Sequence, residues 1–354
     1  MADDIRTYGN FRREIKWRTF NLEISMKKVL VIGSNSFSGS DFVDLLLEKE
    51  TYVVKGVSRS PEKSDVFLPY KKRRSDNFTF HQIDLNRQMS ELEQLLDAFQ
   101  PEYVVNFAAQ SEVAPSWENP DHWFMTNAVA ITKLANVLKG KKYLQKYVHI
   151  SSPEVYGTCE GNLTEDAPMN PSTPYAASKA AGDLSLFTFF KNFQFPLVMI
   201  RATNVYGAHQ QLFKIIPRSF LYIKKKQMIE LHGGGEAVKS YIHIRDVSEG
   251  ELRAMEDGKL GEIYHFSPDQ GVKVKDVVGE ICQLLNAPFH QATKVVGERL
   301  GQDKAYLIDS TKARTFLGWR PRISFQEGLK ETGLWIEKNY AAIAQHPLNY
   351  VHKE

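Results

Sequence analysis

The chain has 354 residues, of which 42% are hydrophobic and 25% charged, a composition typical of a globular protein with one large domain and a smaller one. Its 45 Lys and Arg residues against 42 Asp and Glu give a formal net charge of +3, too small to indicate a nucleic-acid-binding surface. The 2 cysteines lie far apart, so neither a disulfide framework nor a metal site is indicated.

The same composition indicates a cytoplasmic protein. No apolar run reaches the roughly 18 residues that a membrane span needs, so we expect no membrane partner. The amino terminus lacks a basic-then-apolar secretion signal. Residues 1–26 are treated as an extension, because they show no apolar periodicity and Met26 is itself a plausible start.

Short apolar, β-branched runs alternate with helical stretches over the first 200 or so positions. Strands are expected at 29–32, 52–57, 78–83, 103–107, 147–151 and 196–201, with helices at 41–47, 91–99 and 127–138 among them. This alternation predicts an α/β fold, a Rossmann-type doubly wound parallel sheet covered on both faces. The pattern after residue 201 is less regular and predicts a smaller, partly interleaved C-terminal substrate-binding lobe.

We expect the domain boundaries to follow this change of pattern. The dinucleotide-binding Rossmann domain should cover 27–203 and the mainly substrate-binding lobe 204–354. A strand at 263–266 should return to the Rossmann sheet.

A glycine-bearing turn separates the first strand from the first helix, and it reads Gly33-Ser34-Asn35-Ser36-Phe37-Ser38-Gly39. Backbone N–H groups at such a helix start can hold a pyrophosphate. Ser36 stands where the Gly-x-x-Gly-x-x-Gly pattern has glycine, and it still permits close approach if its φ is negative. The alternative is a plain strand–helix turn.

The end of the second strand bears on the choice of dinucleotide. A carboxylate there would bind both ribose hydroxyls of NAD, but the chain has Ser58 and Arg59. Since a guanidinium can bind a 2′-phosphate, NADP is favoured over NAD; the alternative is a surface arginine. Four further candidate cofactor contacts follow the third and fourth strands, namely Asp84, Leu85, Ala108 and Ala109.

Two short motifs together indicate redox chemistry on an alcohol. Tyr175 and Lys179 are four apart, which on a helix places them on one face. A nearby ammonium can stabilise a tyrosinate that otherwise forms only near pH 10, so Tyr175 is a candidate general base. Ser152 and Glu154 directly follow a predicted strand and add a hydroxyl and a carboxylate. A carboxylate beside such a site suggests oxidation followed by elimination.

Several segments taken together resemble the extended short-chain dehydrogenase/reductases, and among them the nucleotide-sugar 4,6-dehydratases. The resemblance runs from about residue 28 to about residue 335. It rests on Val105-Asn106-Phe107-Ala108-Ala109-Gln110-Ser111, Thr126-Asn127, Ser151-Ser152-Pro153-Glu154-Val155-Tyr156-Gly157, Asn170-Pro171-Ser172-Thr173-Pro174-Tyr175 through Lys179, and Arg201-Ala202-Thr203-Asn204-Val205-Tyr206-Gly207.

The resemblance implies a role for each catalytic candidate. Tyr175 would take the proton of the sugar 4-hydroxyl while a hydride leaves C4, and Ser152 would hydrogen-bond the 4-oxygen. Lys179 would bind the nicotinamide ribose and lower the pKa of Tyr175. Glu154 would remove the C5 proton made acidic by the new 4-ketone, so that water leaves from C6. Return of the hydride to C6 then regenerates a tightly held cofactor.

The resemblance also implies binding residues and shows one departure. Asn127 would contact the cofactor. Residues expected to bind the nucleotide-diphosphate sugar are Ser111, Asn204, Lys214, Lys239 and Arg299. Pro153 occupies the position where the dTDP-glucose enzymes carry an aspartate that protonates the leaving hydroxyl. Glu154 would then act as both base and acid, or a water would be the acid.

The helices expected at 127–138 and 176–189 imply, by the same resemblance, a four-helix interface and hence a homodimer. Two other functions stay open. One is an NDP-sugar 4-epimerase or decarboxylase on the same scaffold, and the other is a non-catalytic NADP-binding regulator. Glu154 argues against the epimerase, since inversion at C4 needs no C5 base.

Overall fold

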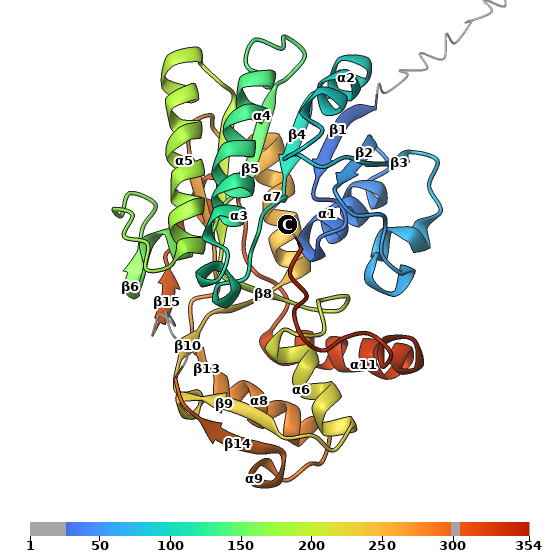
Figure 1. The fold of residues 1–354 in the computed structure, drawn as a ribbon, viewed down its shortest axis with the longest axis vertical. Helices are drawn as coiled ribbons and strands as arrows, with labels where there is room; N and C mark the ends of the chain where they lie inside the picture. The colour runs from blue at the N-terminus through green and yellow to red at the C-terminus, as the bar shows by residue number, and fades with distance from the viewer. Residues whose placement is uncertain (1–25, 299–304, 354) are drawn as a thin grey trace, which may run out of the picture.

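A computed structural model describes residues 26–298 and 305–353 (Figure 1). In this part of the chain, seven parallel strands form one sheet in the order β12-β7-β5-β4-β1-β2-β3. Their bounds are β1 (Lys27–Ile32), β2 (Tyr52–Ser58), β3 (Phe78–Gln82), β4 (Tyr103–Asn106), β5 (Lys146–Ile150), β7 (Leu197–Ala202) and β12 (Ile263–Phe266). The predicted Rossmann-type α/β fold is confirmed.

Helices cover both faces of this sheet. One face carries α1 (Phe37–Glu48), α7 (Ile244–Asp257) and α10 (Thr311–Phe316), and the other carries α2 (Met89–Phe99), α4 (Ile131–Leu138) and α5 (Pro174–Phe193). Side chains such as Phe42 and Leu46 of α1 are fully buried. Each contributes about 2 kcal/mol of hydrophobic free energy at the usual value per unit area. The strands are apolar on both faces because both are covered.

The helix expected at 127–138 begins earlier and is not regular. It starts with α3 (Pro120–Phe124) and passes through the π-helical η4 (Met125–Ala130) before α4. Gly182 of α5 lets η4 approach closely, because a Cβ there would lie 2.2 Å from the carbonyl oxygen of Asn127. Periodicity alone does not reveal this widened turn, which often marks functional sites.

A second lobe lies below the large sheet in Figure 1. Its strands are β6 (Cys159–Leu163), β8 (Asn204–Tyr206), β9 (Ile229–His232), β10 (Val238–Lys239), β11 (Tyr241–His243), β13 (Val272–Lys273), β14 (Thr293–Val296) and β15 (Ala305–Ile308). Its helices are α6 (Ile215–Lys224), α8 (Val274–Leu284), α9 (Phe289–Ala292) and α11 (Phe325–Ile343). Since β6 pairs with β15, the two halves of the chain interleave.

The described residues lack two features of other classes of protein. Within 26–298 and 305–353, no helix has the length and apolarity that a bilayer crossing requires. No cluster of three or more His, Cys, Asp or Glu side chains suited to a metal ion occurs in the same ranges.

Candidate active site

The turn between β1 and α1 has the conformation that a phosphate-binding loop needs. Gly33 has a φ of +85°, and a Cβ there would lie 2.7 Å from the backbone nitrogen of Ala108. A side chain at this position would therefore strain the turn and collide with the chain leaving β4. Gly39 is equally restricted, because its Cβ would lie 2.3 Å from the carbonyl oxygen of Gly33.

Ser36 explains how the turn tolerates a non-glycine residue. Its φ is −72°, negative as the sequence argument requires, and it forms the N-cap of α1. Its hydroxyl accepts a hydrogen bond from the Gly39 N–H at 2.9 Å. The first turn of α1, with Phe37 and Ser38, contains no acidic residue, so its positive end is not neutralised. These residues fit the pyrophosphate of a dinucleotide.

The residues expected near the adenosine half lie at the ends of β2 and β3. The Ser58 hydroxyl accepts a hydrogen bond from the Asn35 N–H at 3.0 Å, which fixes the turn to β2. Arg59 donates to the carbonyl of Lys353 at 3.1 Å. Asp84 accepts from the Asn86 N–H at 2.9 Å. Their contacts with a cofactor stay predictions.

The remaining cofactor candidates have structural partners. Leu85 is buried in the core against α2 and α4. Ala108 donates its N–H to the side chain of Asn106 at 3.1 Å. Asn127 donates to the Gln110 carbonyl and accepts from the Gln110 N–H, both at 2.9 Å. Asn127 therefore holds the segment after β4, and its contact with a cofactor stays a prediction.

An inner cavity of about 340 Å³ brings together the cofactor turn and the catalytic candidates. Predicted residues that line it are Ser36, Phe37, Ser38, Ala109, Ser111, Ser152, Glu154, Tyr175, Lys179, Asn204 and Lys214. An outer cavity of about 590 Å³ shares Glu154, Asn204 and Lys214 with it and adds Lys239. The two cavities thus meet at Glu154, and residues of both lobes form their walls. Arg299 lies outside the described residues.

Tyr175 is placed by the start of α5. Thr173 is the N-cap, and its hydroxyl accepts from the Ala176 N–H at 3.1 Å. Pro174 at the first helical position has a φ suited to a helix start. Tyr175 therefore begins a rigid helix and is only 8% exposed. Burial raises the pKa of its phenol, the charge of Glu154 raises it further, and a hydrogen bond with Ser152 lowers it.

Lys179 lies one turn further along α5 and is 2% exposed. Its ammonium donates to the Ile150 carbonyl at 2.9 Å, at the carboxyl end of β5. Burial lowers the pKa of Lys179 to about 8, against the opposing effect of Asp183. The expected effect of Lys179 on the pKa of Tyr175 stays a prediction, since burial and Glu154 dominate that pKa here.

A buried ion pair supports this part of α5. Asp183 and Arg201 are 2.8 Å apart, and both side chains are almost inaccessible to water. Asp183 also accepts a hydrogen bond from the Ser151 hydroxyl at 2.6 Å. The pair thereby connects α5 to the ends of β5 and β7, the strands below the catalytic candidates.

Glu154 lies in the short helix η5 (Pro153–Tyr156), which follows β5, and Ser152 is the N-cap residue of η5. The Ser152 hydroxyl caps η5 by accepting from the Glu154 N–H at 3.2 Å. Pro153 is buried and has no proton to give. The short η5 turn places Glu154 where its charge acts on the Tyr175 phenol. The Tyr175 phenol and the Glu154 carboxylate, two groups that can exchange protons, therefore line one cavity.

Three cations line the outer cavity, together with carboxylates that include Glu112 and Glu154. Lys214 is the N-cap residue of α6 and forms a 2.6 Å ion pair with Glu112. Arg218 lies one turn along α6 and lines the outer cavity with Lys239. Cations at a helix N-terminus form a suitable site for a diphosphate.

After α11 the chain returns between the two lobes, and its end lies beside α1 in Figure 1. The Gln110 side chain donates to the Lys353 carbonyl at 2.6 Å. The ring of His352 stacks on Trp123 with centroids 5.0 Å apart. Tyr350 lines the outer cavity and packs edge-on against Phe213. This segment closes one side of the site.

Sequence reasoning missed several residues of the two cavities. Arg218 has a signal in retrospect, because it follows Lys214 by four positions on one helix face. No sequence signal marks the other three, because only the tertiary fold brings them to the site; they are Glu112, Glu251 and Tyr350.

The fold and the grouping of Ser152, Tyr175 and Lys179 beside a dinucleotide turn are typical of an extended short-chain dehydrogenase/reductase.

Comparison with known proteins places the chain within that class. A family model described as GDP-mannose 4,6 dehydratase matches residues 30–332, and the chain belongs to this family. The dTDP-glucose 4,6-dehydratase of Haemophilus influenzae is 27% identical over 331 residues, covering 88% of this chain and 98% of that protein.

Solved structures of nucleotide-sugar enzymes have a similar fold. A dTDP-glucose 4,6-dehydratase from Streptomyces venezuelae with NAD has a TM-score of 0.83 at 27% identity, covering 89% of this chain and 98% of that chain. A UDP-glucuronic acid 4-epimerase from Bacillus cereus, also with NAD, has a TM-score of 0.82 at 25% identity, covering 88% and 100%.

The lowered pKa of Lys179 generates a prediction about pH. The charged ammonium is fully present only below its folded pKa of about 8 and is lost as the pH rises through that value. Because the ammonium should bind the ribose of a dinucleotide, affinity should fall several-fold from about pH 7 to about pH 9. Fluorescence titration with NADPH at each pH measures this fall. Lys179→Met should bind weakly and without this dependence, and an equal dependence in both proteins would contradict the assignment.

Proposed function

We propose that the protein converts an NDP-hexose to an NDP-4-keto-6-deoxyhexose, as a nucleotide-sugar 4,6-dehydratase. One observation carries this proposal: the Glu154 carboxylate lines the same cavity as the Tyr175 phenol and lies close enough to raise the pKa of that phenol. A redox enzyme that only oxidises an alcohol has no use for this additional base.

The chain's own residues fit a nicotinamide dinucleotide. The turn from Gly33 to Gly39 and the start of α1 would hold the pyrophosphate, and Tyr175 and Lys179 would hold the nicotinamide ribose. When bound, the dinucleotide supplies a reversible hydride acceptor.

Oxidation at C4 uses the inner cavity. As the hydride leaves C4, Tyr175 accepts the proton of the 4-hydroxyl, and the Ser152 hydroxyl hydrogen-bonds the oxygen that becomes the ketone. Burial raises the pKa of Tyr175 in the free protein. A nearby ammonium favours the tyrosinate, which is the contribution expected of Lys179 in the complex.

Elimination follows at the neighbouring carbon. The new ketone acidifies C5, and the Glu154 carboxylate removes that proton. The C6 hydroxyl leaves as water by taking a proton from Glu154 or from a water, since Pro153 has none to give. A bound dinucleotide would supply the hydride that C6 gains, and a proton would reach C5, so that the net change in the sugar is the loss of one water.

The outer cavity would hold the nucleoside diphosphate. Lys214 and Lys239, which the resemblance assigned, face it together with Arg218. The relatives act on dTDP- and UDP-sugars by name, so a nucleoside diphosphate is the class of handle expected here.

A 4-epimerase is the second candidate, favoured by the similar fold of the Bacillus cereus epimerase and by Pro153 at the acid position. It predicts an unchanged substrate mass and inversion at C4, whereas the dehydratase predicts the loss of one water.

The decisive experiment incubates the purified protein with UDP-, GDP-, CDP- and dTDP-hexoses and measures product mass. Glu154→Gln should lower the rate of water loss by about 10²- to 10⁴-fold, the usual contribution of a general base, while cofactor reduction stays measurable by absorbance. Glu112→Gln is the matched control, because Glu112 lines only the outer cavity of the two and should affect KM more than kcat. Water loss by Glu154→Gln at the wild-type rate would overturn the proposal.

We propose NADP as the preferred dinucleotide, supported by Arg59 directly after β2. Arg59→Ala should weaken NADP binding by about tenfold and NAD binding much less, because only NADP carries the 2′-phosphate. Calorimetry with both dinucleotides measures the ratio, and Arg74→Ala, at an exposed position, should leave it unchanged. An equal loss for both dinucleotides would refute the preference.

We propose a homodimer that uses one face of η4 and α5. Met125 and Val129, one turn apart on η4, are 45% and 40% exposed, and Leu184 on the adjacent α5 is 57% exposed. Val129→Asp with Leu184→Asp should yield monomers by light scattering, because charge at an apolar interface is unfavourable. Leu334→Asp, at an exposed position of α11, is the control, and an unchanged dimer in the double variant would refute this interface.

We also propose that residues 27–203 bind the dinucleotide and 204–354 mainly the sugar nucleotide. A cytoplasmic setting is supported by two free cysteines, Cys159 and Cys282, both buried.

A further inference from the structure

Glu251 is a buried acid that the proposed mechanism does not use. It lies on α7, is 1% exposed, and lines the inner cavity together with Val247, one turn earlier on the same face. One carboxyl oxygen, Oε2, has no hydrogen-bond partner among the residues that the structure describes. Such a group destabilises a folded chain unless a ligand satisfies it.

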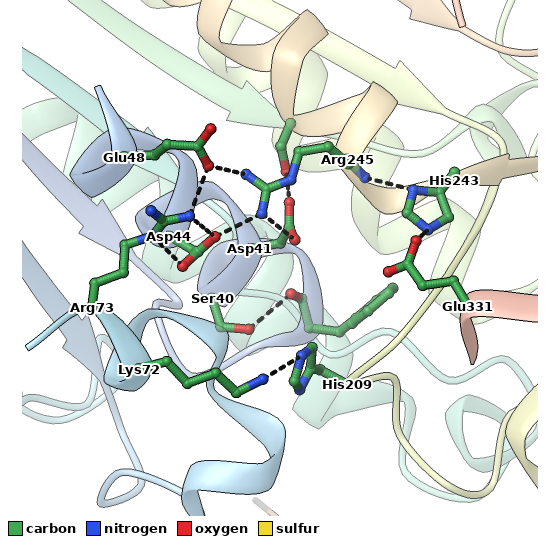
Figure 2. Close-up of polar contacts among 12 residues, drawn as sticks. Ser40, Asp41, Asp44, Glu48, Lys72, Arg73, His209, His243, Arg245 and Glu331 are labelled. Carbon is green, nitrogen blue, oxygen red and sulfur yellow. Dashed lines mark hydrogen bonds and ion pairs between the residues drawn. The ribbon is translucent and has the colours of Figure 1, made fainter. Parts of the chain in front are cut away.

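The neighbouring charges do not neutralise Glu251. Figure 2 shows Arg245 of α7 directed toward the carboxylates of α1, and Arg253, the other arginine of α7, donates to the Leu317 carbonyl at 2.9 Å. Arg245 lies 2.7 Å from Asp44 and 3.4 Å from Asp41. Asp41 itself accepts a hydrogen bond from Ser248 at 2.7 Å. Burial raises the pKa of Glu251 well above its usual range and Asp41 raises it further, and both effects favour the protonated carboxylic acid.

The position of Glu251 identifies what faces it. The cavity wall around it is formed by Phe37 of α1, Ile150 at the end of β5 and Ala202 at the end of β7. In a doubly wound sheet, the ligand lies across these carboxyl ends. With the pyrophosphate on the β1–α1 turn and the ribose beside Tyr175 and Lys179 in the same cavity, the nicotinamide ring would be the part of the dinucleotide that reaches this wall.

We propose that Glu251 binds the nicotinamide carboxamide of the dinucleotide through a paired hydrogen bond. A neutral carboxylic acid offers one O–H donor and one carbonyl acceptor side by side, and a carboxamide offers the complementary pair. The inference rests on the proposed use of a nicotinamide dinucleotide and adds a residue that holds the ring in its orientation.

The test compares ligand affinity with stability. Glu251→Leu should lower affinity for NADP about tenfold, the size expected for the loss of a hydrogen bond, without altering affinity for ADP-ribose, which lacks nicotinamide. The ligand-free variant should melt at a higher temperature than the wild type, because an unsatisfied buried acid has been removed. Glu251→Gln keeps one donor and one acceptor, so its NADP affinity should stay within about twofold of wild type.

Each other outcome has a distinct meaning. Unchanged NADP affinity in Glu251→Leu, an equal loss of ADP-ribose, or a lower melting temperature would overturn the role of Glu251. A loss in Glu251→Gln equal to that in Glu251→Leu would also overturn it. Failure of the wild type to bind either ligand would instead refute the proposed dinucleotide site.

Discussion

The removal of Tyr175 and Lys179 from water is the constraint on which the site depends. One turn of α5 lies against the ends of β5 and β7, where burial raises the pKa of the phenol and lowers that of the ammonium to about 8. Burial therefore favours the neutral phenol strongly and the neutral amine only partly, so that Lys179 is still charged at pH 7 and its ammonium can oppose the raised pKa of Tyr175 in the complex. Water in this cavity would return both pKa values toward their ordinary range and would weaken the interaction between the two groups.

The rest of the fold maintains this burial. The Asp183–Arg201 pair and the Ser151 hydroxyl fasten α5 to the sheet, and removing either ion would leave a buried charge at a cost of about 3–5 kcal/mol. Close packing at Gly182 brings η4 against α5, and Asn127 of η4 in turn holds the segment after β4. The ion pair, the close contact at Gly182 and the hydrogen bonds of Asn127 therefore all help to hold the first turn of α5 in place. The second lobe contributes the cations of the outer cavity, and Glu154 lies where this proposed diphosphate site joins the inner, catalytic cavity.

Much of this could be predicted from the sequence, since the signals are local. Strands with β-branched runs, the Gly33–Gly39 turn and the helix after Pro174 follow from short-range rules, and these rules placed Ser152, Glu154 and Tyr175 at strand and helix ends. The rest depends on contacts between distant segments. The π-helical turn follows from a close approach to Gly182, and Tyr350 reaches the site only because the chain returns after α11. Glu251 reads as an ordinary helix residue until α1 and α7 pack together. No periodicity encodes these three features.

The central claim is that Tyr175 and Glu154 act in turn on adjacent carbons of one sugar. The most direct test follows a deuterium label at C4 of the accepted NDP-hexose through a single turnover in ordinary water, with the product analysed by NMR. The account predicts that the deuterium appears at C6 of a 4-keto-6-deoxy product and that C5 acquires hydrogen from the solvent. Deuterium that remains at C4, with the C6 hydroxyl intact, would contradict it.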